Sequence, residues 1–63
     1  MNPFSELIEW SANEKRGLVL FVKGQTVAGI VVKIGEDGTI ELKSQTYSRI
    51  IVRLDAIDAI AAS

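Results

Sequence analysis

The side chains able to do chemistry in this 63-residue chain are mainly charged groups, because it contains no histidine and no cysteine. Its serines have no visible base partner, so the usual nucleophile–base pairs are missing. Asp55 and Asp58 lie three residues apart, across a turn that leads into a strand and does not place them on one face. We interpret them as solvated or turn-capping carboxylates rather than an acid/base pair or a metal site. We therefore expect no enzyme, no catalytic residue, no metal and no cofactor.

Arg53 is the residue best suited to contact a ligand, because it ends an apolar segment and precedes an apolar turn. Binding of single-stranded RNA needs cations for the phosphates and flat groups for stacking, and a guanidinium can both stack on a base and bond to its edges. The alternative is an ion pair of Arg53 with Asp55 or Asp37. The net charge of −1 argues against a general nucleic-acid binder, which usually carries a basic patch.

Two weaker groupings remain open. Lys43, Tyr47 and Arg49 could form a second binding patch on the outward faces of adjacent strands, although a half-exposed, cross-strand Tyr47 is the simpler interpretation. A further basic group, which could gather near one end of the fold or form a solvated rim, consists of Lys15, Arg16 and Lys23.

The elements that position these residues begin with a helix over about residues 3–14. Asn2 is a suitable N-cap, and Pro3 suits the first helical position because its missing N–H costs nothing there. Gly17 is the expected residue just beyond the end of the helix. One face of the helix is expected to cover a core, and it carries Phe4, Leu7, Ile8 and Ser11, with Trp10 on its flank.

Five short strands are expected over about residues 17–61. Residues 18–22 are apolar on both faces, which is typical of a strand buried on both sides. In residues 26–34, Gly29 indicates a bend. Residues 35–38 contain two glycines and predict a hairpin turn, and residues 39–43 then alternate, with Ile40 and Leu42 inward. Strands over 46–53 and 57–61 follow, separated by a brief turn at 54–56.

This pattern predicts a mostly β fold: an N-terminal α-helix followed by a five-stranded, strongly bent, antiparallel SH3-like barrel, closed or nearly closed. Apolar residues make up 48% of the chain, which is high for a domain whose own core must be small. We therefore expect part of this apolar surface to be buried in a homo-oligomer. The longest uninterrupted apolar run, residues 18–22, is too short to span a membrane, and no signal peptide is visible, so we expect a cytoplasmic protein.

Residues 23–43 resemble the first signature of the Sm-like family, which includes Hfq and the Sm and LSm proteins. Residues 50–53 resemble the second signature, in which an apolar strand leads into an Arg-Gly pair. The chain differs from the family at Gly35, where Asp is usual, and at Thr39, where many members have Asn. It also differs at Asp37, near a base-stacking position, and at Leu54, which replaces the Gly of the pair. The matching positions are Gly24, Val27, Gly29, Val31, Ile34, Ile40, Leu42, Ile50, Ile51, Val52, Arg53, Ile57 and Ile60.

The resemblance implies one Sm-like domain over residues 1–63, assembled head to tail into a homo-oligomeric ring of about five to seven subunits. In such rings the fourth strand of one subunit pairs with the fifth strand of its neighbour. The resemblance also implies binding of short single-stranded RNA, U- or A-rich, at the pore through Thr39 and Arg53. Asp37 would lie at the same loop, where a carboxylate repels phosphate. The alternative is a ring-forming structural or protein-interaction module without RNA binding, and neither function involves a membrane.

Overall fold

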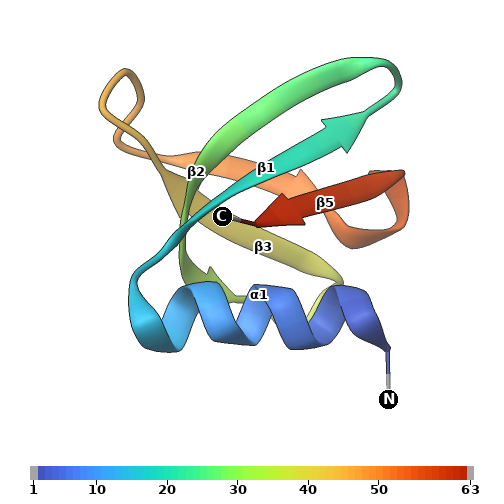
Figure 1. Ribbon diagram of the computed structural model, residues 1–63, viewed down its shortest axis with the longest axis horizontal. Helices are drawn as coiled ribbons and strands as arrows, with labels where there is room; N and C mark the ends of the chain where they lie inside the picture. Colours follow the sequence, from blue (N-terminus) through green and yellow to red (C-terminus); the bar gives the residue numbers. More distant parts are fainter. Residues whose placement is uncertain (1, 63) are drawn as a thin grey trace.

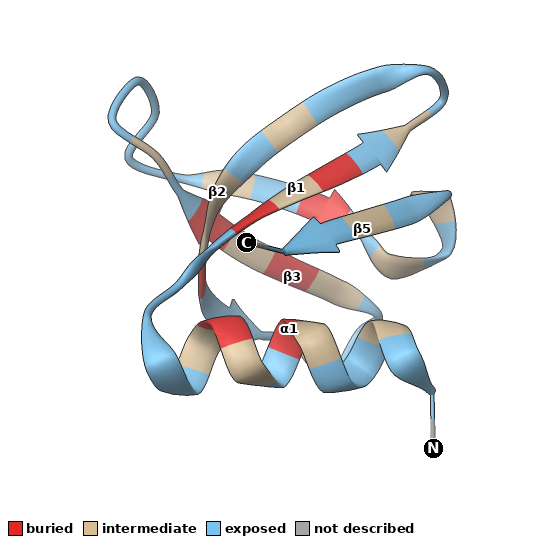
Figure 2. Ribbon diagram, viewed as in Figure 1, coloured by how far each residue is buried: buried red, intermediate tan, exposed pale blue. Residues whose placement is uncertain are grey.

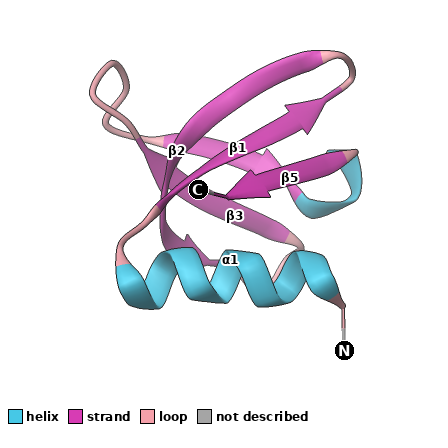
Figure 3. Ribbon diagram, viewed as in Figure 1, coloured by secondary structure: helices cyan, strands magenta, loops and turns pink. Residues whose placement is uncertain are grey.

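A computed structural model describes residues 2–62, which form one helix and five strands (Figure 1). The helix lies across one end of the twisted sheet (Figure 3). The expected order of a helix followed by five antiparallel strands, and hence the mostly β class, is confirmed. The elements are α1 (Pro3–Glu14), β1 (Gly17–Val22), β2 (Gln25–Ile34), β3 (Thr39–Lys43), β4 (Ile50–Arg53), the short 3₁₀ helix η1 (Leu54–Ala56) and β5 (Ala59–Ala62).

Helix α1 has the predicted bounds, but a different residue from the expected one closes its last turn. The Asn2 side chain accepts a hydrogen bond from the Phe4 N–H at 2.9 Å, so Asn2 is the N-cap. At the other end, Lys15 adopts the left-handed conformation with φ 57°. The N–H groups of Lys15 and Arg16 both return to the carbonyl of Ser11, which closes the last turn. The prediction that Gly17 is the residue just beyond the end of the helix was therefore wrong, and Gly17 instead begins β1.

The five strands form one antiparallel sheet in the order β4-β3-β2-β1-β5 (Figure 1). The first four strands follow one another as a meander, and β5 returns to lie beside β1. The sheet is open, because β4 and β5 are its two edges and do not pair with each other within residues 2–62. A barrel closed or nearly closed was expected, and its fully closed form was wrong, because no hydrogen bonds join the edge strands β4 and β5 in the described residues.

Strand β2 bends where it passes closest to β3. A Cβ at Gly29 would lie only 2.7 Å from the Lys43 carbonyl oxygen, so only glycine fits this approach. Two residues further on, the pairing shifts between Val31 and Lys33, which leaves Val32 as a bulge. Bulges bend a strand and increase its twist. The predicted bend at Gly29 is thus part of a longer curved segment.

Ser11 connects helix α1 to this curved segment. Its side chain is fully buried, and its Oγ accepts a hydrogen bond from the Val31 N–H at 3.1 Å. The same hydroxyl donates to the Arg16 carbonyl at 2.5 Å. Both hydrogen-bonding roles of a buried hydroxyl are therefore filled, and the helix is tied to the backbone of β2.

The core lies between α1 and the inner face of the sheet. Ile40 and Leu42 on β3 are almost completely buried, which confirms their predicted inward direction. Figure 2 shows buried residues on the helix as well as on β1 and β3. The buried apolar set consists of Ile8, Leu18, Leu20, Val31, Ile40, Leu42, Val52 and Ile57.

Strand β1 is buried on one side only. Leu18 and Leu20 are fully enclosed, whereas Phe21 on the other face is 38% exposed and Val19 is half-buried. The prediction of a strand buried on both sides was wrong for the single chain, because no second layer formed by residues 2–62 covers the outer face of β1.

The last two strands are displaced from their predicted bounds. Strand β4 begins at Ile50 rather than at residue 46, because residues 44–47 close a tight loop. In that loop the Ser44 N–H donates to the Tyr47 carbonyl at 2.8 Å, and the Tyr47 N–H donates to Ser44 Oγ at 3.1 Å. Strand β5 begins at Ala59 rather than at residue 57, because the Ile57 N–H bonds to the Leu54 carbonyl and completes the 3₁₀ turn.

Candidate functional site

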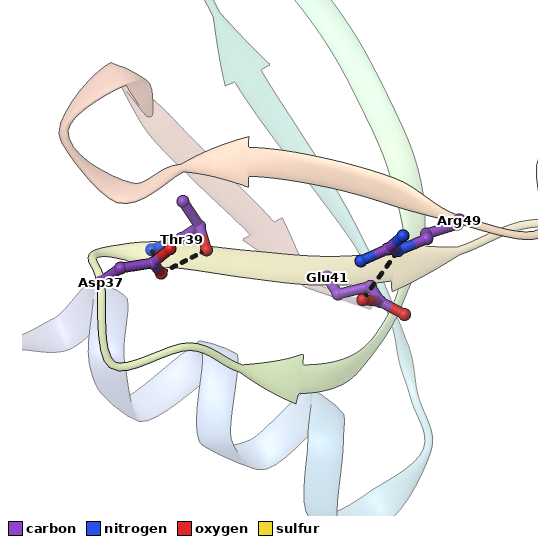
Figure 4. A network of polar contacts seen from close by, with 4 residues as sticks. All are labelled: Asp37, Thr39, Glu41 and Arg49. Atoms are coloured by element: carbon purple, nitrogen blue, oxygen red, sulfur yellow. Dashed lines mark hydrogen bonds and ion pairs between the residues drawn. The ribbon is translucent and has the colours of Figure 1, made fainter.

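The turn between β2 and β3 fixes the position of Asp37. The predicted hairpin turn is confirmed, with Gly38 at φ 85°. Asp37 Oδ1 accepts hydrogen bonds from the Thr39 hydroxyl at 2.7 Å and from the Thr39 N–H at 3.3 Å (Figure 4). A Cβ at Gly35 would lie 2.8 Å from that same carboxylate oxygen, so the absence of a side chain at Gly35 leaves room for it. Asp37 therefore stabilises the turn.

The same hydrogen bonds change the acidity of Asp37. The Thr39 hydroxyl is the main cause that lowers the pKa of this carboxyl below its ordinary value of 3.8. Desolvation acts in the opposite direction, and the Thr39 N–H and the charge of Lys33 add smaller lowering effects. Asp37 is thus a carboxylate at neutral pH.

Arg53 lies directly opposite Thr39 in the pairing of β3 with β4. Its Nη2 contacts Asp55 Oδ2 at 3.2 Å, and both side chains are about three-quarters exposed, at 74% and 73%. This is one of the ion pairs considered as an alternative to a ligand contact for Arg53. Because both partners are exposed, the pair contributes little to stability and leaves the rest of the guanidinium in solvent.

The structure brings the three predicted site residues together. Asp37, Thr39 and Arg53 line one open depression of about 450 Å³, together with Gly38 and the η1 residues Leu54 and Asp55. A hydrogen bond of 2.8 Å from the Leu54 N–H to the Gly38 carbonyl connects the two loops that form it. We call this depression the loop site. It contains two carboxylates and one guanidinium, so its net charge is negative.

A second ion pair lies on the same face of β3 and was missed at the sequence level. Arg49 Nε contacts Glu41 Oε1 at 3.1 Å (Figure 4). Both residues line a larger depression of about 670 Å³, which also includes Lys33, Thr39 and Ile51. The two partners are eight residues apart, and no local spacing rule links them. Only the position of Glu41 opposite Ile51 in the pairing of β3 with β4 brings them together.

The proposed second patch divides between two hollows. Tyr47 is 63% exposed and lies in the loop before β4 rather than on a strand. Tyr47 and Arg49 line one hollow against Thr26 and Ile50, whereas Lys43 lines a different one beside Gly29. The outward strand faces predicted for this patch were wrong, because residues 46–49 form a loop.

The basic residues near the helix do not gather. Arg16 precedes β1 and Lys23 follows it, so the six-residue strand separates them by about 20 Å. The Arg16 guanidinium instead lies 5.8 Å from the centre of the Trp10 ring, a cation–π contact, and Trp10 packs against the core.

The remaining carboxylates have separate roles. Asp55 pairs with Arg53, while Asp58 Oδ2 accepts a hydrogen bond from the Lys23 N–H at 2.9 Å and so fixes the turn between β1 and β2. No three acidic side chains within residues 2–62 gather closely enough to hold a metal ion. The interpretation of Asp58 as a turn-capping carboxylate is confirmed.

No family model matches the chain, and no curated protein matches it significantly.

Within residues 2–62, α1 is the longest helix at 12 residues, and no helix has the length and apolar character needed to cross a bilayer.

Proposed function

We propose that the chain is a ring-forming module of the Sm-like type, in which copies join head to tail through the two edges of the sheet. The observation that carries this proposal is the open sheet. Its edges β4 and β5 are equal in length, and each has a strand partner on one side only within residues 2–62. Unpaired strand edges are templates for pairing with another chain. A contact between two different edges of identical copies closes into a ring when its rotation permits.

The side chains of the two edges support such pairing. On β4, Val52 points inward and is buried, whereas Ile51 points outward and is 51% exposed. On β5, Ile60 is half-buried on the inner side and Ala61 is small and exposed. Pairing these edges would extend both faces of the sheet, placing Ile51 beside small outward residues. Burial of Ile51 would then contribute to the free energy of association.

The geometry best supports a structural or protein-interaction role for this ring. In the loop site, Asp37 and Asp55 stand against the single positive charge of Arg53. Each copy would repeat this arrangement, so the ring would collect negative charge at equivalent positions. RNA phosphates are repelled by such a surface.

Binding of short single-stranded RNA is the second candidate, and one observation favours it. Thr39 and Arg53 lie opposite each other, and the Arg53 side chain is 74% exposed, so part of the guanidinium is free to stack on a base. In this case the RNA would have to displace Asp55 from Arg53.

Native mass spectrometry with and without a short oligo-U or oligo-A strand tests both candidates. A ring without bound RNA supports the interaction module. A ring that gains the mass of one strand supports RNA binding, which should then weaken steeply as salt rises and disappear in Arg53→Ala. A chain that stays monomeric at all concentrations contradicts the ring.

A matched pair of variants tests the edge contact itself. Ile51→Lys places a charge beside the β4 edge and is expected to give monomers, because a lysine at an edge strand discourages pairing. Val32→Lys changes an equally apolar residue, 44% exposed, on an interior strand and should leave the ring intact. Equal masses for the two variants would contradict pairing through β4.

A further inference from the structure

The outer face of β5, β1 and β2 is an exposed surface without charge. Residues that pair directly across antiparallel strands share a face, so the pairing defines its rows. Because Leu18 and Leu20 point into the core, Val19 and Phe21 point outward, and their partners do so too. We call this surface the outer patch. Its three rows are Ala61–Val19–Ala28, Ala59–Phe21–Thr26 and Gly17–Ile30, and Lys43 lies beside Ile30 at the border of the patch.

The outer patch has a hollow at one end. Gly17 has no side chain to fill this region, and Ala28 and Ala61 are small. They line a hollow of about 380 Å³, which continues past Gly17 into a second one of about 580 Å³ bordered by Ile30. The linings of both hollows are mainly apolar.

The opposite end of the outer patch has a projecting aromatic side chain. Phe21 is 38% exposed on the same face of β1 as Gly17. The two residues are four positions apart, about 13 Å along the strand. Val19 lies midway between them, about 7 Å from each. The projection and the hollow are therefore placed symmetrically about the row that contains Val19.

This symmetry indicates which molecule can cover the outer patch. A two-fold axis that runs across the strands through Val19 reverses the strand direction and places Phe21 of each copy over the Gly17 hollow of the other. In such a contact the outer patches of two identical chains face each other, so a charged patch would place like charges together. The outer patch carries no charge and avoids this repulsion. We propose that the outer patch binds the outer patch of a second copy of this chain, with Phe21 seated in the hollow at Gly17.

The area of the outer patch determines whether the contact is stable between two single chains. Three strands about 5 Å apart and five residues about 3.4 Å apart cover roughly 200 Å² in projection. A stable interface needs about 800 Å² per partner, so one such contact alone is weak. In a ring every copy presents the same patch, and two facing rings make all these contacts at once. This inference rests on the proposed ring, and it predicts a double ring.

Native mass spectrometry separates the two proposals. A mass of twice one ring supports both of them. A single ring supports edge pairing and overturns the outer-patch contact. Dimers that persist in Ile51→Lys, in which the β4 edge is blocked, support the outer-patch contact independently of the ring. Monomers in both the wild-type chain and the variant overturn both proposals.

A charge-swap experiment tests the two-fold geometry. Ala28 lies in the row on the axis, so it faces Ala28 of the second copy. Ala28→Glu and Ala28→Lys should each halve the mass of the double ring, because each places like charges together. Mixing the two variants should restore the doubled mass through Glu–Lys pairs. Failure of the mixture to recover would overturn the two-fold arrangement.

Two further variants guard against a trivial loss of folding. Val32→Glu introduces the same charge at an exposed position of β2 outside the outer patch and should keep the doubled mass. Phe21→Ser removes the projection without adding charge and should halve the mass. Far-UV circular dichroism of each variant checks that the chain is folded. A doubled mass that persists in Phe21→Ser would overturn the role of Phe21.

Discussion

Replacing Ser11 with alanine removes a single oxygen atom, yet it should strongly destabilise the fold. The change removes the acceptor of the Val31 N–H, which lies 3.1 Å from Ser11 Oγ in a buried position. It also removes the donor to the Arg16 carbonyl. A buried polar group left without a partner costs about 1–3 kcal/mol, while the better helix propensity of alanine returns at most about 0.5 kcal/mol. We expect a net loss of about 2 kcal/mol.

That loss is large for a chain of this size. A 63-residue domain has a free energy of unfolding of about 3–9 kcal/mol, and a loss of about 2 kcal/mol lowers its melting temperature by roughly 8–16 °C. The assay is urea and thermal unfolding followed by circular dichroism and by the fluorescence of Trp10. The measurement is best made in the Ile51→Lys background, so that loss of assembly does not contribute to the midpoint.

Ser5→Ala is the matched control, because Ser5 lies on the same helix and is exposed. It carries the same gain in helix propensity without removing a buried hydrogen bond, so its stability should stay equal or rise slightly. If Ser11→Ala and Ser5→Ala unfold at the same urea concentration, the hydrogen bonds of Ser11 to Val31 and Arg16 do not stabilise the fold.

Three other changes test the fold and the loop site. Gly29→Ala should cost about 1–3 kcal/mol because its Cβ meets the Lys43 carbonyl at 2.7 Å, whereas Gly17→Ala, with its nearest atom at 3.9 Å, should be nearly neutral in urea unfolding. The pKa of Asp37 is lower in the folded chain than the value of 3.8 in the unfolded chain, so its contribution to stability is complete above pH 3.8 and is lost as the pH falls through the folded pKa. Asp37→Asn should therefore make the free energy of unfolding depend less on pH in this acidic range. Asp58→Ala removes one exposed turn hydrogen bond and should cost about 1 kcal/mol or less in thermal unfolding; a larger loss would mean that this turn controls more of the sheet.

The sequence predicts best those elements whose signals are local. The cap at Asn2, the turn at residues 35–38 and the alternation around Ile40 and Leu42 each depend on a few neighbouring residues, and all three are present in the structure. The bounds of α1 were predicted correctly, but the residue that closes its last turn was not. Lys15 closes the last turn in a conformation that glycine usually adopts, and no composition rule favours lysine there.

The remaining differences arise from contacts between distant residues. Residues 46–49 have strand-like composition, but the hydrogen bonds between Ser44 and Tyr47 turn them into a loop. In the loop site, opposite pairing brings Thr39 and Arg53 together, as expected from the resemblance. The carboxylate of Asp55 beside Arg53 was foreseen as an alternative, and choosing between the two required the side-chain geometry.

Both faces of strand β3 make contacts that depend on its register, so the length of the chain before β3 matters. Ile40 and Leu42 fill the core, while Thr39 holds Asp37 and Glu41 holds Arg49 on the other side. A shift of one residue would exchange the two faces and break all of these contacts together. Insertions or deletions at 35–38, just before β3, should therefore be rejected. The exposed loop at 45–49 does not pack its residues on two opposite faces as β3 does, so natural variants and engineered insertions of different length should accumulate there.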